Sequence, residues 1–133
     1  MKTILFACVH NAGRSQMAAA LFNATADPKQ ARAMSAGTAP ATQVHPEVVA
    51  AMRELGIYLS DATPTLLTDA LVRNVDILVT MGCGEQCPVV PGVQRLDWDL
   101  PDPKGREIQQ VRAIRDDIKA RVEHLVSTLT LEL

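Results

Sequence analysis

The segment Cys8–Ser15 constrains this chain of 133 residues more than any other feature. Its thiol ends a continuous apolar run, residues 3–8, which is typical of a strand buried on both faces. Residues 14–25 then predict a helix. A loop between such elements gathers backbone N–H groups around one centre, and the helix N-terminus adds positive potential there. We therefore expect a receptor for a tetrahedral oxyanion, formed by Val9, His10, Asn11, Ala12, Gly13, Arg14 and Ser15.

The side chains of this loop suit nucleophilic attack on the bound anion. Arg14 can hold two oxygens with its planar fork, and the same positive field favours the thiolate of Cys8. Ser15 is placed to donate a hydrogen bond to that thiolate. Asn11 suits a left-handed backbone position, and Gly13 allows close approach to the anion. A buried core thiol beside an unrelated surface arginine is the alternative interpretation, which the strand–loop–helix context disfavours.

The rest of the chain alternates strands with helices. We expect strands at 31–35, 76–81 and 93–96, a helix from His45-Pro46 that ends at Gly56, and a long closing helix that begins near residue 104. This alternation predicts one α/β domain over residues 1–133, with a parallel sheet and helices on both of its faces. Ligands of such sheets bind beyond the carboxyl ends of the strands, where Cys8 and Cys83 both lie.

The composition excludes several classes of function. With 13 basic and 15 acidic residues and only 3% aromatic residues, the chain lacks the charge and the stacking surface of a nucleic-acid or anionic-membrane binder. Its apolar runs are too short to span a membrane, and we recognise no secretion signal. Three cysteines make a structural disulfide framework improbable, so we expect a reducing cytoplasm. We expect a monomer, although the sequence, which has no coiled-coil seam or repeated apolar patch, does not itself report the oligomeric state.

A second group of cysteines, Cys83 and Cys87, follows the strand expected at 76–81. If that strand pairs in parallel with residues 3–8, their carboxyl ends lie roughly 5 Å apart, and Cys83 comes near Cys8. A bridge requires Cα atoms within about 7 Å and therefore a loop shift, which the flanking Gly82 and Gly84 facilitate. Zinc is the alternative, but no second Cys/His pair completes a set of four ligands, so we expect no metal.

A carboxyl group before the closing helix is the candidate general acid. Asp102, in the pair Asp102-Pro103, could protonate a departing oxygen above the anion loop. Ordinary turn chemistry is the alternative explanation of an Asp-Pro pair. Asp97 and Asp99 are competing candidates for the same role.

At these residues the chain resembles the low-molecular-weight protein tyrosine phosphatase superfamily, whose signature is Cys-x5-Arg-Ser. The run CVHNAGRSQMA is similar to that of the arsenate reductases built on this fold. The likeness continues through Ser35-Ala36-Gly37, His45-Pro46, the run DILVTM, the cysteine-bearing loop and WDLPDPKG. It implies a four-stranded parallel sheet with flanking helices, Cys8 as the nucleophile and Asp102 as the general acid.

The resemblance also implies a reaction without a bound cofactor. Cys8 attacks arsenate (phosphate or sulfate would mimic it), Cys83 attacks Cys8 and releases arsenite, and Cys87 closes a Cys83–Cys87 disulfide that an external dithiol such as thioredoxin reduces. The two relay cysteines are closer together here than in thioredoxin-linked members, and Gly82 stands where the first of them would be. That spacing looks more like members that use a small thiol such as mycothiol with a glutaredoxin-like partner, mycoredoxin.

Further departures and alternatives accompany the resemblance. Ala19 and Thr65 replace residues of the potassium site of some relatives, so we expect no potassium site. The alternatives are a phosphatase that hydrolyses phosphate monoesters through a Cys8 phosphoenzyme, an arsenate–mycothiol transferase, and a non-enzymatic oxyanion sensor. A phosphotyrosine pocket needs aromatic walls, yet the nearest aromatic residues are Trp98 and Tyr58. Reduction of arsenate consumes reducing equivalents, whereas ester hydrolysis does not.

Overall fold

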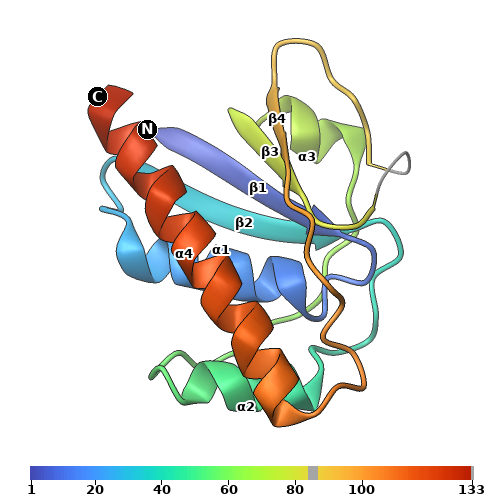
Figure 1. The fold of residues 1–133 in the computed structure, drawn as a ribbon. Coiled ribbons are helices and arrows are strands. Elements are labelled where there is room, and N and C mark those ends of the chain that lie inside the picture. The colour runs from blue at the N-terminus through green and yellow to red at the C-terminus, as the bar shows by residue number, and fades with distance from the viewer. Residues whose placement is uncertain (84–86, 133) are drawn as a thin grey trace.

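A four-stranded parallel sheet forms the centre of the protein in a computed structural model, which describes residues 1–83 and 87–132 (Figure 1). The strand order is β2-β1-β3-β4. The strands are β1 (Lys2–Cys8), β2 (Ala31–Gly37), β3 (Ile77–Thr80) and β4 (Gln94–Asp97). Parallel pairing aligns the carboxyl ends of β1, β2 and β3, with Cys8 opposite Gly37 and Ala7 opposite Thr80. The predicted α/β class and four-stranded parallel sheet are confirmed.

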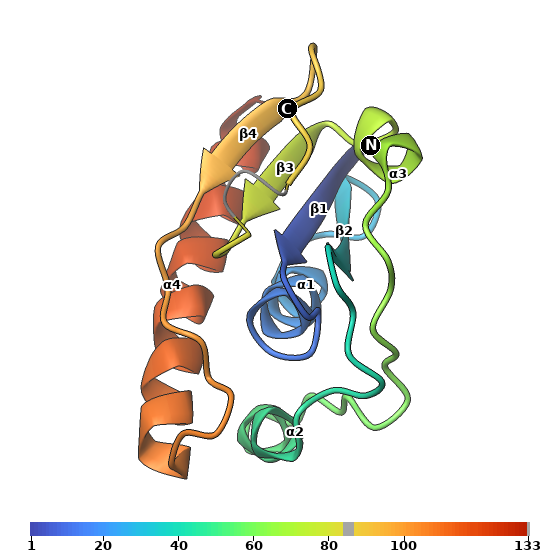
Figure 2. The ribbon, with the colours of Figure 1, turned by 90° about the vertical axis from the view of Figure 1, so that its right-hand side faces the viewer.

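Helices cover both faces of the sheet, as the sequence predicts (Figure 2). The first face carries α1 (Arg14–Thr25) and α4 (Ile108–Glu132), and the opposite face carries α3 (Asp69–Arg73). The helix α2 (Pro46–Arg53) lies on the side of α1 and α4, farther from the sheet, and packs against α4. None of the helices in the described part of the chain combines the length and apolar character needed to cross a bilayer.

The observed elements differ from the expected ones mainly at their ends. β2 continues to Gly37, and α4 begins at Ile108 because the preceding chain turns through Gly105, whose φ is +70°. The helix α3 was not predicted from the sequence. This helix has five residues, too few to show a helical period, although its N-cap Thr68 accepts a hydrogen bond from the backbone N–H of Leu71.

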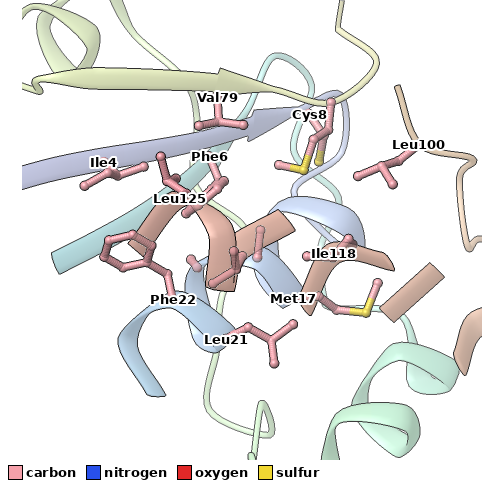
Figure 3. Close-up of a cluster of buried hydrophobic side chains, with 14 of the residues drawn as sticks. Ile4, Phe6, Cys8, Met17, Leu21, Phe22, Val79, Leu100, Ile118 and Leu125 are labelled. Carbon is pink, nitrogen blue, oxygen red and sulfur yellow. The ribbon is translucent and has the colours of Figure 1, made fainter. Parts of the chain in front are cut away.

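Alternation along β1 divides the core into two clusters. Ile4, Phe6 and Cys8 point into the larger cluster, which α1 and α4 cover, while Leu5 and Ala7 point into the smaller cluster on the α3 side. Figure 3 shows the larger cluster, with Cys8 at its end where β1 stops. The helical period expected in α4 is confirmed, since its inward positions are buried: Val111, Ile114, Ile118, Val122, Leu125 and Leu129.

A cluster of ion pairs fastens α2 to α4. Glu54, the C-cap of α2, accepts hydrogen bonds from Arg112 at 2.6 Å and from Arg115 at 2.7 Å. Arg115 is buried and also donates to the carbonyl oxygen of Ala51 at 2.8 Å. The hydrogen bonds from Arg112 and Arg115 lower the pKa of Glu54 to about 2. The folded state therefore favours the ionised carboxylate.

We predict that this carboxylate makes stability depend on pH in the acid range. Because its pKa in the folded state lies below the ordinary value, its contribution is complete above that value and is lost as the pH falls toward 2. Urea unfolding should show Glu54→Gln less stable than the wild type near neutral pH, with the difference shrinking on acidification. Asp117→Asn, which removes an exposed partner of Arg121, is the control and should show little change. A pH-independent difference for Glu54→Gln would contradict the prediction.

Candidate active site

The carbonyl oxygens of the loop between β1 and α1 bind the segment of the same chain that follows β2. Four of its carbonyls accept hydrogen bonds of 2.8–3.2 Å from backbone N–H groups, in the pairs Cys8–Thr38, Val9–Ala39, His10–Ala41 and Ala12–His45. Within the described residues, no backbone–backbone hydrogen bond uses the N–H groups of residues 9–13. These N–H groups are therefore left for an oxyanion, next to the N-terminus of α1.

The amide of Asn11 fixes the shape of this loop. Asn11 is fully buried and has φ +50°, which confirms the left-handed position expected for it. Its Oδ1 accepts hydrogen bonds from the backbone N–H of Thr65 at 2.9 Å and from Gln16 Nε2 at 3.2 Å. Since a backbone N–H can only donate, Thr65 determines which end of the amide is the oxygen. The Nδ2 group is thereby directed to Ser15 Oγ, at 2.7 Å.

The thiol of Cys8 lies 2.8 Å from the hydroxyl oxygen of Ser15, and both side chains are buried. The Ser15 hydroxyl accepts from Asn11, so its own hydrogen remains to be donated to the sulfur. This network suits a thiolate, which accepts hydrogen bonds, and the first turn of α1 adds its positive end to the same place. In Figure 3, Leu100 belongs to the same buried cluster and lies near the Cys8 side chain.

Arg14 connects the loop to the segment before α4. Its Nη1 donates to the carbonyl oxygen of Leu100 at 2.9 Å, and its Nη2 lies 3.9 Å from Asp102 Oδ2. The two segments also pack directly, because a Cβ added to Gly13 would lie 2.8 Å from Cγ of Pro103. Gly13 was expected to give room to the anion, and the structure adds a second reason for a glycine there. The acid loop, residues 100–103, thus lies against the anion loop, residues 8–15.

Of the three candidate acids, Asp102 has the position closest to what the role requires. Its Oδ1 accepts from the backbone N–H of Lys104 at 3.0 Å, while Oδ2 faces Arg14. Asp97 is bound to the hydroxyl of Thr80 and to Arg95, and these hydrogen bonds lower its pKa. A carboxyl group held in its ionised form is a poor proton donor. Asp99 is exposed and has no described contact with Arg14.

Cys83 and Cys87 form a disulfide, with Cα atoms 5.6 Å apart, and Cys8 is the free cysteine. Both disulfide sulfurs belong to buried residues in the smaller cluster, on the α3 side of the sheet. Cys83 Sγ lies 4.0 Å from the carbonyl oxygen of Ala7, so this cysteine is beside the end of β1, as the sequence predicts. Its side chain, however, packs in the cluster opposite to that of Cys8. Gly84, the second flanking glycine, lies outside the described residues.

Two contributors to the site carried no signal in the sequence. Leu100 acts through its carbonyl oxygen, which every residue type has, so its identity could not reveal the contact with Arg14. Thr65 acts through its backbone N–H and comes from a distant segment, after β2. The contact between Asn11 and Ser15, in contrast, has a hint in the sequence, because residues four apart can meet across a turn.

Comparison with known proteins agrees with this geometry. The family described as "Low molecular weight phosphotyrosine protein phosphatase" matches residues 3–133, and the chain belongs to this family. An arsenate reductase of Brevibacillus brevis is 37% identical, with 96% of each chain covered. A glutaredoxin arsenate reductase of Synechocystis sp. is 32% identical, covering 98% of this chain and 100% of the relative.

A solved structure extends the comparison. The thioredoxin-dependent arsenate reductase of Corynebacterium glutamicum superimposes with a TM-score of 0.87 at 40% identity, over 100% of this chain. This chain spans 64% of that longer one. The resemblance inferred from the Cys-x5-Arg-Ser segment is confirmed.

We predict that Asn11→Ala destabilises the fold and disorders the anion site together. The substitution leaves the buried N–H of Thr65 without its acceptor and places alanine at φ +50°, which should cost about 2 kcal/mol or more. Asn23→Ala is the matched control, since Asn23 also bonds a backbone N–H and carbonyl, those of Ala33, but at the surface.

The measurements are urea unfolding and the protection of Cys8 from alkylation by inorganic phosphate. Asn23→Ala should lose about 1 kcal/mol or less and keep the protection. Equal losses of stability in both variants, with phosphate protection retained in Asn11→Ala, would refute the assigned role of Asn11.

Proposed function

We infer that the protein is a thiol-dependent arsenate reductase. The observation that carries this inference is the pairing of two features at one sheet edge: a free, buried Cys8 inside an anion loop, and a Cys83–Cys87 disulfide beside the same strand end. Hydrolysis of a phosphate ester needs only the first feature. Reduction of an oxyanion by the protein's own thiols needs both, because the two electrons then leave the protein as a disulfide. The arsenate reductases among its relatives support the same conclusion.

We propose that the reaction begins at the anion loop. The loop N–H groups and Arg14 hold arsenate, and the Cys8 thiolate attacks arsenic. One oxygen leaves as water, with a proton supplied by Asp102, whose Oδ2 already faces Arg14. The product is an As(V) adduct on the Cys8 sulfur. Inorganic phosphate or sulfate should occupy the same place as a mimic.

The Cys83 thiolate then attacks the sulfur of Cys8. A Cys8–Cys83 bond forms, the bond between arsenic and sulfur breaks, and its electron pair stays on arsenic, which leaves as arsenite. The Cys87 thiolate next attacks Cys83 and releases Cys8 as a thiolate. The resulting Cys83–Cys87 bond is the one present in the structure, with Cys8 free. A Cys83–Cys87 disulfide with Cys8 free is the form that this sequence of steps leaves before an external thiol reduces it.

An external thiol completes the cycle, and no bound cofactor takes part. Relatives described as thioredoxin-dependent and as a glutaredoxin arsenate reductase support a reductant of this kind. We propose thioredoxin, or a small thiol with a glutaredoxin-like partner. We place the enzyme in the cytoplasm, where thiols are kept reduced. We also propose a monomer as the working unit, because the loop, the acid and the three cysteines all come from one chain.

The phosphatase alternative is not favoured by the aromatic residues. A phenyl ring held over the anion loop needs an aromatic wall. Trp98 packs on Phe6, with ring centroids 5.6 Å apart, and belongs to the border of the larger cluster. Tyr58 is 70% exposed. The remaining alternative is a transferase that uses an external thiol in place of Cys83. Mapping the thiols after a single turnover distinguishes this transferase from the reductase with a Cys83–Cys87 relay.

We predict that Cys8→Ser reduces arsenate turnover to less than about a hundredth of the wild-type rate, because a serine hydroxyl stays protonated where the thiolate would form. The loop N–H groups and Arg14 are unchanged in this variant, so inorganic phosphate should still raise its thermal unfolding temperature. Turnover above that level would remove Cys8 from its role as nucleophile.

A single-turnover experiment tests the relay. One equivalent of arsenate, added to the reduced enzyme without any other thiol, should release arsenite and consume two thiols that peptide mapping assigns to Cys83 and Cys87. Cys87→Ser should stop one step earlier, with a Cys8–Cys83 disulfide. If all thiols remain free and arsenite appears only after a small thiol is added, the external thiol does the work of Cys83, and the transferase alternative holds.

A further inference from the structure

Gly82 stands directly against the guanidinium group of Arg14. A Cβ added to Gly82 would lie 2.6 Å from Arg14 Nη1 and 3.2 Å from Cζ and Nη2. Real Cβ atoms do not approach other atoms so closely, so any side chain at this position requires Arg14 to move. Gly82 also has φ +90°, a conformation that other residues rarely adopt. The backbone at Gly82 therefore forms one wall of the space that Arg14 occupies.

The acid loop also contacts this guanidinium. The Leu100 carbonyl accepts from Nη1, and Asp102 lies 3.9 Å from Nη2. The Arg14 side chain is only 11% exposed. If the guanidinium moves away from a new Cβ at residue 82, its hydrogen bond to the Leu100 carbonyl and its distance to Asp102 both change.

We propose that Gly82 is a positioning residue for the reaction: the absence of a side chain there lets Arg14 lie between the cysteine segment and the acid loop, in the orientation that grips the oxyanion. This proposal rests on the proposed role of Arg14 as the anion clamp. Gly82 precedes Cys83, so the chain that carries the relay thiol also forms the wall behind the clamp. From the sequence alone, Gly82 was expected only to facilitate movement of the loop.

The test compares Gly82→Ala with Gly92→Ala. Gly92 has φ +89°, nearly the same as Gly82, but an added Cβ there meets no atom within 4 Å. Both substitutions therefore place alanine at nearly the same positive φ, and only Gly82→Ala intrudes on Arg14. The readout is the concentration of inorganic phosphate that half-protects Cys8 from alkylation. It is measured on oxidised enzyme, in which Cys8 is the free thiol.

We expect Gly82→Ala to raise the half-protecting phosphate concentration about tenfold or more, as for a weakened charged hydrogen bond, and Gly92→Ala to leave it unchanged. In an Arg14→Ala background, where protection is already weak, adding Gly82→Ala should cause no further loss, because the two residues act through one guanidinium. For the same reason, arsenate turnover by Gly82→Ala should suffer mainly in KM.

The outcomes separate the two proposals. If Arg14→Ala loses protection while Gly82→Ala keeps it, Gly82 has no positioning role and the clamp stands. If Arg14→Ala itself keeps full protection, the clamp fails and this proposal fails with it. Should Gly82→Ala not fold, the double variant with Arg14→Ala should fold again, because the clash is removed. A double variant that remains unfolded, while Arg14→Ala and Gly92→Ala fold, would overturn the proposal.

Discussion

The buried amide of Asn11 is the interaction on which the arrangement of the site depends. Asn11 binds the segment after β2 through Thr65 and the first turn of α1 through Ser15, so one side chain joins three parts of the chain. Its oxygen is committed to a backbone donor, and its nitrogen must therefore donate to Ser15. This leaves the hydrogen of Ser15 for Cys8. The protein thus prepares an acceptor position at the sulfur before any substrate arrives, which is the preorganisation that electrostatic catalysis requires.

The sheet separates the two kinds of cysteine chemistry. Side chains alternate along β1, so Cys8 faces the cluster under α1 and α4, whereas Ala7 faces the cluster that holds Cys83 and Cys87. In the disulfide state Cys83 is therefore withdrawn from Cys8 although it lies beside the same strand end. A relay through Cys83 requires its segment to pass around the carboxyl edge of the sheet. The segment begins at Gly82, where the backbone also contacts Arg14.

The sequence was most informative where chemistry depends on residue type. The apolar run before Cys8 predicted β1, the period of the closing helix predicted α4, and the Cys-x5-Arg-Ser segment predicted the anion loop and the family. The sequence was silent where contacts use the backbone. The Leu100 carbonyl and the Thr65 N–H could belong to any residue, and their partners are distant in the chain. The contact between Gly82 and Arg14 could not be predicted without the structure either, because a residue that has no side chain adds nothing to a sequence pattern.

The two ends of the chain lie far from the anion loop (Figure 1). β1 starts and α4 finishes at the edge of the sheet opposite to the Cys8 loop (Figure 1). A domain tethered to either end would lie away from the anion loop and would need a linker that reaches along the whole length of β1. An affinity tag or a surface attachment at either end would therefore leave the anion loop accessible. A fused redox partner would gain effective concentration only if its linker spanned that length.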